Sequence, residues 1–127
     1  MAIPSGPGTE VLHRGTVKDE QTQTTFLKWD GSAQTTVGTT NYVPQHHIVT
    51  LLNISFCNKG TASNTLTMMF YNGTNSIRLI KQDIGGGQTF VWNDRIVLHY
   101  NDSIQLYGSV SEDTDIVYNY IDQDWTT

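Results

Sequence analysis

Four histidines are the side chains best suited to bind a metal ion, and two of them, His46 and His47, are adjacent. Neighbouring residues on a strand point to opposite faces, so this pair could hold one ion only from a loop. A loop after Pro44 would allow that, but no carboxylate or cysteine stands nearby at ligand spacing. The pair is therefore interpreted as a loop or strand start that holds no metal.

Acidic side chains gather near the end of the chain, in Glu112-Asp113-Thr114-Asp115 and at Asp122 and Asp124. Calcium takes six to eight oxygen ligands and could use such a loop. The glycine and glutamate offsets of an EF-hand are absent, however. A solvated hairpin turn is the favoured interpretation.

No nucleophile lies in a recognisable catalytic pattern. The serines lie outside the nucleophile-elbow pattern. Gly85-Gly86-Gly87 is followed by Gln88-Thr89 and lacks the Lys-Ser/Thr of a phosphate-binding loop, so it is predicted to be a turn. The single cysteine, Cys57, ends the apolar run Leu51–Cys57 and is predicted to be a small buried hydrophobe. We therefore expect no enzymatic activity and no cofactor.

The elements that would position these residues are short strands. From Ile48 onward, turn signals such as Asn72-Gly73 and Asn101-Asp102 separate β-rich runs at regular spacing, which is typical of a β-sandwich or barrel. We predict an all-β fold of eight or nine short strands in two packed antiparallel sheets, with jelly-roll or Greek-key connections and very little helix. Ten runs are candidates for these eight or nine strands: Val11–Lys18, Gln23–Trp29, Thr35–Val43, Ile48–Cys57, Leu66–Tyr71, Ile77–Ile80, Thr89–Trp92, Arg95–Leu98, Ile104–Tyr107 and Ile116–Ile121.

The alternation of apolar residues predicts which side chains share a face. In the run from Ile48 to Phe56, the even positions Ile48, Leu52, Ile54 and Phe56 are expected to form one apolar face, interrupted at position 50. Apolar residues at positions 49 and 51 would then lie on the opposite face, which is compatible with burial on both sides.

Length and charge limit the class of protein. The chain has 127 residues, enough for one domain, and we expect an extended arm over residues 1–10 followed by a sandwich over 11–127. A net charge of −5 and scattered basic residues argue against nucleic-acid binding. The chain has no apolar run of roughly 20 residues and opens without a signal-peptide pattern, so we expect no membrane partner and synthesis in a cytoplasm.

Five segments and the opening of the chain carry a resemblance. They are I-V-T-L-L-N-I-S-F-C-N (Ile48–Asn58), Y-N-G-T-N (Tyr71–Asn75), F-V-W-N-D-R-I-V-L (Phe90–Leu98), N-D-S-I-Q-L (Asn101–Leu106), D-I-V-Y-N-Y-I-D-Q-D-W (Asp115–Trp125) and M-A-I-P-S-G-P-G-T-E-V-L (Met1–Leu12). The chain resembles small β-sandwich structural proteins of tailed bacteriophages, especially those of marine and cyanobacterial phages. Asn101-Asp102 stands where that family usually has Gly-Asp, a change that keeps the turn chemistry.

The resemblance implies a virion component without catalytic residues or cofactor, made in the bacterial host. We expect a capsid-decorating (cement) protein that binds the major capsid protein or other virion proteins, commonly as a homo-oligomer, with a trimer favoured. A tail, neck or fibre component is the alternative within the virion. A carbohydrate-binding module is the competing class, because exposed tyrosine and tryptophan rings could stack on sugars.

Two terminal segments are the expected contact elements, the arm Ala2–Leu12 and the aromatic end Tyr118–Trp125. Both carry apolar side chains with little local reason to be buried, and terminal arms can tie neighbouring subunits together. The candidate contact residues are Ile3, Pro4, Val11, Leu12, Tyr118, Tyr120 and Trp125.

Overall fold

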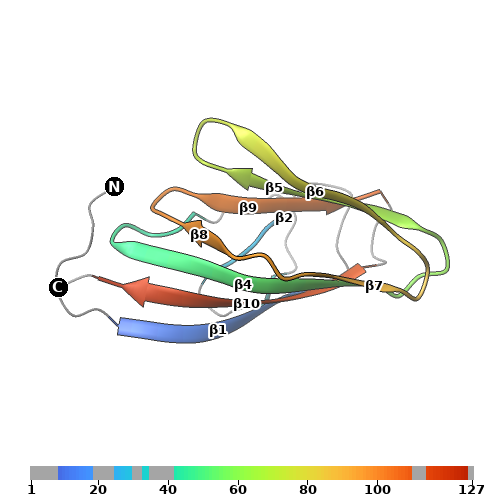
Figure 1. The fold of residues 1–127 in the computed structure, drawn as a ribbon, viewed down its shortest axis with the longest axis horizontal. Helices are drawn as coiled ribbons and strands as arrows, with labels where there is room; N and C mark the ends of the chain where they lie inside the picture. Colours follow the sequence, from blue (N-terminus) through green and yellow to red (C-terminus); the bar gives the residue numbers. More distant parts are fainter. Residues whose placement is uncertain (1–8, 19–24, 30–32, 35–41, 110–113, 126–127) are drawn as a thin grey trace.

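The structure is a computed structural model that describes residues 9–18, 25–29, 33–34, 42–109 and 114–125. Its described elements are all strands, arranged in two sheets that pack face to face (Figure 1). Eight strands have three residues or more, and two further strands have two residues each. The predicted all-β sandwich of antiparallel sheets is therefore confirmed. No helix in the described residues is long and apolar enough to cross a membrane.

The larger sheet has six strands; β10 is the middle strand of its order, and β4 pairs with β10 on one side and with β7 and β8 on the other. Every pairing in it is antiparallel except the two-residue contact of β3 with β1. In spatial order the strands are β3 (Ala33–Gln34), β1 (Thr9–Val17), β10 (Thr114–Asp124), β4 (His47–Asn58) and β7 (Thr89–Trp92), with β8 (Ile96–Leu98) also paired to β4.

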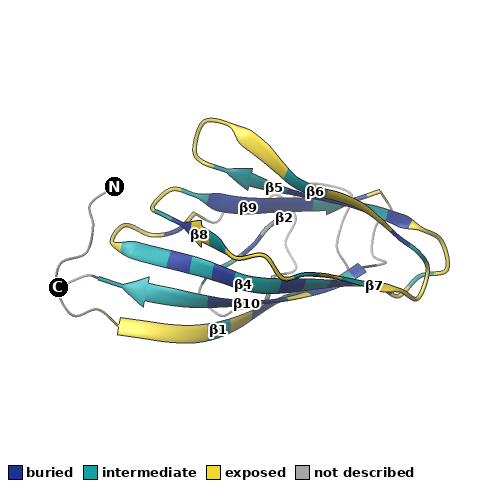
Figure 2. Cartoon of the chain, viewed as in Figure 1, coloured by how far each residue is buried: buried dark blue, intermediate teal, exposed yellow. Residues whose placement is uncertain are grey.

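The smaller sheet has four antiparallel strands, in the order β2 (Thr25–Phe26), β9 (Ser103–Gly108), β5 (Asn64–Tyr71) and β6 (Ser76–Ile84). The hairpin between β5 and β6 turns at Asn72-Gly73, as the sequence predicts, and Gly73 has a φ of 91° that suits glycine. Most of β9 is buried, whereas the outer part of β6 is exposed (Figure 2). This places β9 over the centre of the core and β6 at its rim.

The first strand begins earlier than expected. β1 starts at Thr9, and Thr9 and Glu10 already lie opposite Asp124 and Gln123 of β10. Residues 9 and 10 of the expected arm (residues 1–10) therefore belong to the sheet, and residues 1–8 lie outside the described residues.

A bulge in β4 changes which of its residues face the core. Asn53 lies opposite Asn119 and Leu51 lies opposite Tyr120, so Leu52 is an extra residue with no direct partner on β10. Before the bulge the odd positions are buried, and after it the even positions are buried. The face predicted from Ile48, Leu52, Ile54 and Phe56 is therefore wrong in its first half, because one inserted residue reverses the alternation.

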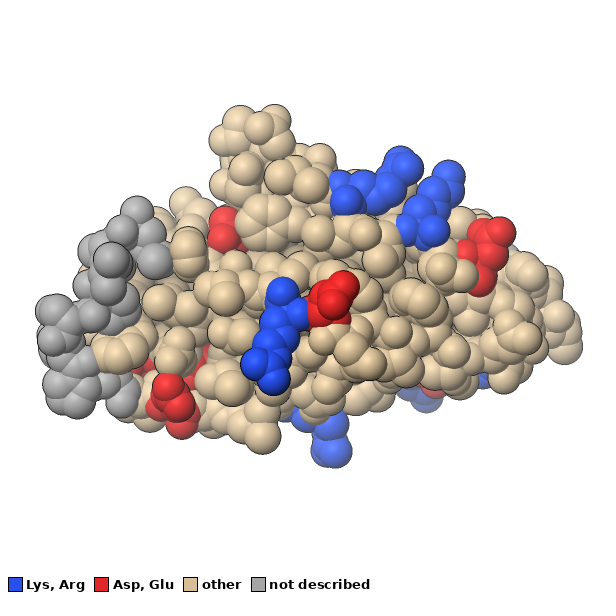
Figure 3. Space-filling model, viewed as in Figure 1, with Lys and Arg blue, Asp and Glu red and all other residues tan. Residues whose placement is uncertain are grey.

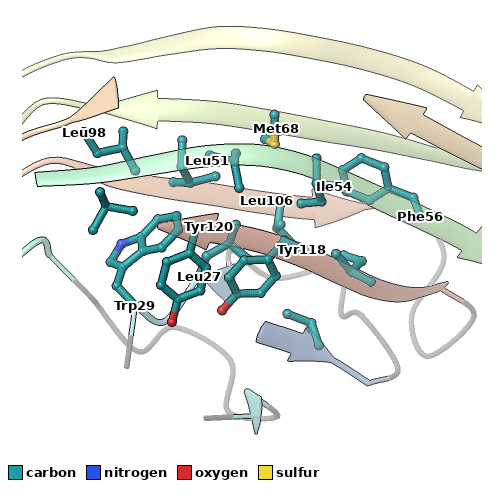
Figure 4. Close-up of a cluster of buried hydrophobic side chains, with 14 of the residues drawn as sticks. Leu27, Trp29, Leu51, Ile54, Phe56, Met68, Leu98, Leu106, Tyr118 and Tyr120 are labelled. Atoms are coloured by element: carbon teal, nitrogen blue, oxygen red, sulfur yellow. The ribbon is translucent and has the colours of Figure 1, made fainter. Parts of the chain in front are cut away.

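Aliphatic side chains make up most of the core between the sheets, and a group of aromatic rings packs among them (Figure 4). Tyr118 and Tyr120 are both fully buried and stack on each other with ring centroids 5.6 Å apart, and Trp29 meets both rings edge-on. The Tyr118 hydroxyl accepts a hydrogen bond from the Lys28 backbone N–H (3.0 Å) and donates one to the Lys28 carbonyl (2.5 Å). Tyr118 and Tyr120 were expected as surface contacts; that prediction is wrong because β10 turns both rings inward.

Candidate assembly surface

The remaining predicted contact residues divide into three groups. Val11 and Leu12 lie on β1 with 42% and 69% of their surface exposed, so both are accessible to a partner. Trp125 is half-buried, and its backbone N–H donates to the His46 carbonyl at 2.9 Å. Ile3 and Pro4 lie outside the described residues.

A larger surface lies on the side of the six-stranded sheet that faces away from the core. We call it the outer face, and the registers of β1, β10, β4, β7 and β8 define it. One row across it is Leu12, Ile121, Thr50 and Val97, and a second row is Thr16, Val117, Ser55 and Val91. The run Ile116–Ile121 predicted from the sequence includes residues of the outer face. That this face continues across four strands follows only from the registers.

The outer face is rich in aliphatic and hydroxyl side chains. Val97, Val91 and Val117 are 53%, 49% and 37% exposed, with small polar residues between them. Arg14 and the ion pair of Lys59 with Asp115 (3.2 Å) supply charge near its margins. On the side of the molecule drawn in Figure 3, most of the surface is likewise uncharged. Contiguous apolar area is a feature of surfaces that meet other proteins, and the exposed valines of neighbouring rows supply apolar area that a partner could cover.

Cys57 lies on the same outer face, opposite Asp115 on one side and Thr89 on the other. Its side chain is exposed and is a free thiol. The prediction of a buried cysteine is therefore wrong. The reason is again the bulge, which leaves Phe56 and Asn58 inward and Cys57 outward.

The adjacent histidines take different roles. His46 has a φ of 66° in the turn before β4, whereas His47 begins the strand. The His47 Nδ1 lies 2.8 Å from an Asp122 carboxylate oxygen, and its Nε2 lies 3.5 Å from one of Asp124. Among the described residues, no group of three or more histidine, cysteine or acidic side chains could hold a metal ion. The contact of His47 with Asp122 and Asp124 joins the start of β4 to the end of β10.

The acidic and glycine-rich loops are partly described. Glu112 and Asp113 lie outside the described residues, and Asp115 pairs with Lys59. Gly87 has a φ of 75° and donates its N–H to the Asn58 carbonyl at 2.8 Å. The glycine cluster is thus the predicted turn.

A hollow of about 310 Å³ lies on the outside of the four-stranded sheet. It combines two cationic side chains, a tyrosine and several hydroxyl groups, from Thr65, Thr67, Arg78, Lys81, Tyr107, Gly108 and Ser109. Tyr107 is one of the tyrosines whose rings could stack on a sugar, and the neighbouring cations come from β6 and are brought there by strand pairing.

Comparisons with known proteins inform the fold. No family model matches the chain, and no curated protein matches it. One similar solved structure is a chain from work described as "Bacillus endospore appendages form a novel family of disulfide-linked pili". The two chains share 12% sequence identity with a TM-score of 0.51, over 99% of this chain and 97% of that one. At this identity the likeness concerns the fold alone.

Proposed function

We propose that this chain is a non-enzymatic structural protein of a bacteriophage virion, where it decorates and stabilises the assembled head. The observation that carries the proposal is the outer face, an exposed sheet surface with Val91, Val97 and Val117 among small polar residues. Burying such a surface against a partner releases water from apolar area and needs few charges to be desolvated.

The resemblance of the sequence to phage virion proteins directs the proposal to a virion. The similar pilus chain gives a second, weaker argument, because that chain is described as forming pili, which are also assemblies of repeated subunits. In the proposed mechanism, the sandwich lies where capsid subunits meet, and its outer face contacts more than one of them. Separating the subunits would then require exposing the apolar area that the sandwich covers.

A binding experiment with undecorated heads tests this proposal. We expect the purified chain to co-sediment with expanded empty heads of the phage that encodes it. The double variant Val91→Lys/Val97→Lys should lose this binding. The matched control is Ile77→Lys, which changes an aliphatic residue of β6 that is 50% exposed on the other sheet. Equal binding by the double variant and the wild type would refute the role of the outer face.

The copy number per virion distinguishes the head from the tail. Hundreds of copies would support decoration of the head, whereas a few copies would indicate a tail, neck or fibre component instead. The arm has its own test, since deletion of Met1–Gly8 leaves all described strands in place. We expect the shortened chain to fold and to bind heads more weakly, and undiminished binding would remove the arm from the mechanism.

The hollow on the four-stranded sheet favours carbohydrate binding as a second candidate function. Arg78 and Lys81 could meet an acidic sugar, while Tyr107 offers a ring and Thr65 a hydroxyl. A glycan array tests this function directly. Binding to acidic glycans that is lost in Arg78→Ala/Lys81→Ala would support it, and absence of binding to any glycan would refute it.

A further inference from the structure

The strand β1 has an edge that the described strands leave largely uncovered. On one side, all nine of its residues pair with β10. On the other side, β3 pairs only with Thr16 and Val17. Among the described strands, none pairs with this side of residues Thr9–Gly15, and most of that stretch is exposed (Figure 2). An exposed strand edge presents backbone N–H and C=O groups that can pair with another strand.

The seven residues of this edge are self-complementary when they meet a second copy. Leu12 is the middle residue, and Glu10 and Arg14 lie two positions before and after it. Because side chains alternate along a strand, these three share the outer face. If two copies pair in antiparallel fashion with Leu12 opposite Leu12, each Glu10 lies opposite the Arg14 of the other copy.

The charges select this register over its neighbours. When two copies pair in antiparallel fashion about a twofold axis, one residue lies opposite the same residue of the other copy. The nearest alternative registers are therefore centred on Val11 or on His13 instead of Leu12. Centring on Val11 places Glu10 opposite Leu12, and centring on His13 places Arg14 opposite Leu12. Of these three registers, only the one centred on Leu12 joins opposite charges, and it also spans the whole edge from Thr9 to Gly15.

We propose that β1 pairs edge to edge with β1 of a second copy, so that two six-stranded sheets join into one continuous sheet. In strand addition of this kind, main-chain hydrogen bonds supply the affinity, and contacts between side chains determine the register. It would cover Leu12, whose side chain is 69% exposed, and bring Val11 opposite His13 of the other copy. A hydrogen bond from Gln123 Nε2 to Glu10 Oε1 (2.6 Å) holds that carboxylate on the outer face.

This inference goes beyond the proposed function and holds or fails without it. A twofold contact builds a dimer, which differs from the trimer that the resemblance favours. The contact also leaves Val91 and Val97 of the outer face uncovered, because they lie at the opposite side of the sheet.

Reversing one charge at a time tests the pairing. We expect the wild type to form a dimer in sedimentation velocity at about 100 µM, and Glu10→Arg and Arg14→Glu each to dimerise at least about tenfold more weakly, because each places two like-charge pairs in the contact. A 1:1 mixture of the two variants should recover dimers, because one chain then carries two cations and the other two carboxylates. Arg78→Glu, on an exposed part of the other sheet, is the control and should dimerise like the wild type.

Circular dichroism establishes that each variant is folded, and amide exchange on the wild type gives an independent measurement. Protection of the amides between Thr9 and Gly15 should rise with protein concentration. A monomeric wild type, unchanged dimerisation of both variants, or a mixture that stays monomeric would each overturn the proposal. Protection that is independent of concentration in this segment would overturn it as well.

Discussion

Asn58 should be the least replaceable polar side chain at the end of β4. It is fully buried, and its side-chain nitrogen donates to the carbonyls of Ala62 and Ile84, at 2.8 Å each. Its side-chain oxygen accepts the Gly60 N–H at 3.0 Å. We predict that Asn58→Asp, a change of nearly identical shape, strongly destabilises the fold, because an oxygen without a proton would face two carbonyl oxygens.

The expected cost follows from these contacts. Two hydrogen bonds are lost, each worth about 1 kcal/mol, and their acceptors are left without partners, which adds about 1–3 kcal/mol. We therefore expect a loss of about 3–5 kcal/mol in the free energy of unfolding, a large part of the roughly 5–15 kcal/mol typical of a domain. For a chain of this length the melting temperature should fall by about 10 °C or more.

Acid should relieve part of this loss. Burial without a cation raises the pKa of the introduced carboxyl above its unfolded value of about 3.9. The loss of stability is therefore greatest above the raised pKa. It decreases as the pH falls through that value, because the protonated group can donate one hydrogen bond again. The difference in melting temperature between variant and wild type, measured by circular dichroism, should be larger at pH 7 than at pH 4.

Asn72 provides the matched control. It is exposed in the turn between β5 and β6, and its side-chain oxygen accepts the N–H groups of Thr74 (3.0 Å) and Asn75 (2.8 Å). Asn72→Asp keeps both acceptor roles and should change the melting temperature by no more than about 2 °C. A melting temperature of Asn58→Asp near that of the wild type, or an equal loss in Asn72→Asp, would refute the reasoning.

Three further predictions concern the core and the outer face. Gly15→Ala should lose about 1–3 kcal/mol of stability in urea unfolding, because its added Cβ would overlap the buried Tyr118 ring; an unchanged midpoint would contradict this. Tyr118→Phe should cost about 1–3 kcal/mol, because the Lys28 N–H and carbonyl both lose their partner, and an unchanged stability in the same assay would contradict this. Cys57 should react with a thiol reagent in the folded protein at a rate similar to that in denaturant, since its side chain is exposed; reaction only after unfolding would mean that the thiol is covered.

Local patterns were sufficient for the turns and for most strands of the second half. β7 spans the predicted residues, and β5, β9 and β10 contain their predicted runs. The turn at Asn101 has the positive φ (71°) that asparagine tolerates well. The first half was less predictable: β2 covers only Thr25–Phe26 of a longer expected run, and residues 35–41 of another lie outside the described residues.

The candidate surface was harder to predict than the fold. Val11 and Leu12 were predicted as contact residues and are exposed, but Tyr118 and Tyr120 are core residues. Alternation separates a strand into two faces, yet it does not say which face meets the other sheet when both carry large side chains. On β10 the tyrosine face was the inner one, because those rings fill the space beside Trp29.

The sequence by itself determined that the chain forms short antiparallel strands with defined turns, because those properties depend on neighbouring residues. The tertiary structure decided what those strands present to the outside. One extra residue at Leu52, recognisable only against β10, turned Cys57 outward, and the registers aligned aliphatic residues of four strands on one face. The pairing of β10 and β3 also decided that the edge from Thr9 to Gly15 is the part of β1 to which a second copy could bind. Strand pairing joins residues far apart in the sequence, so these features exist only once the sheets have formed.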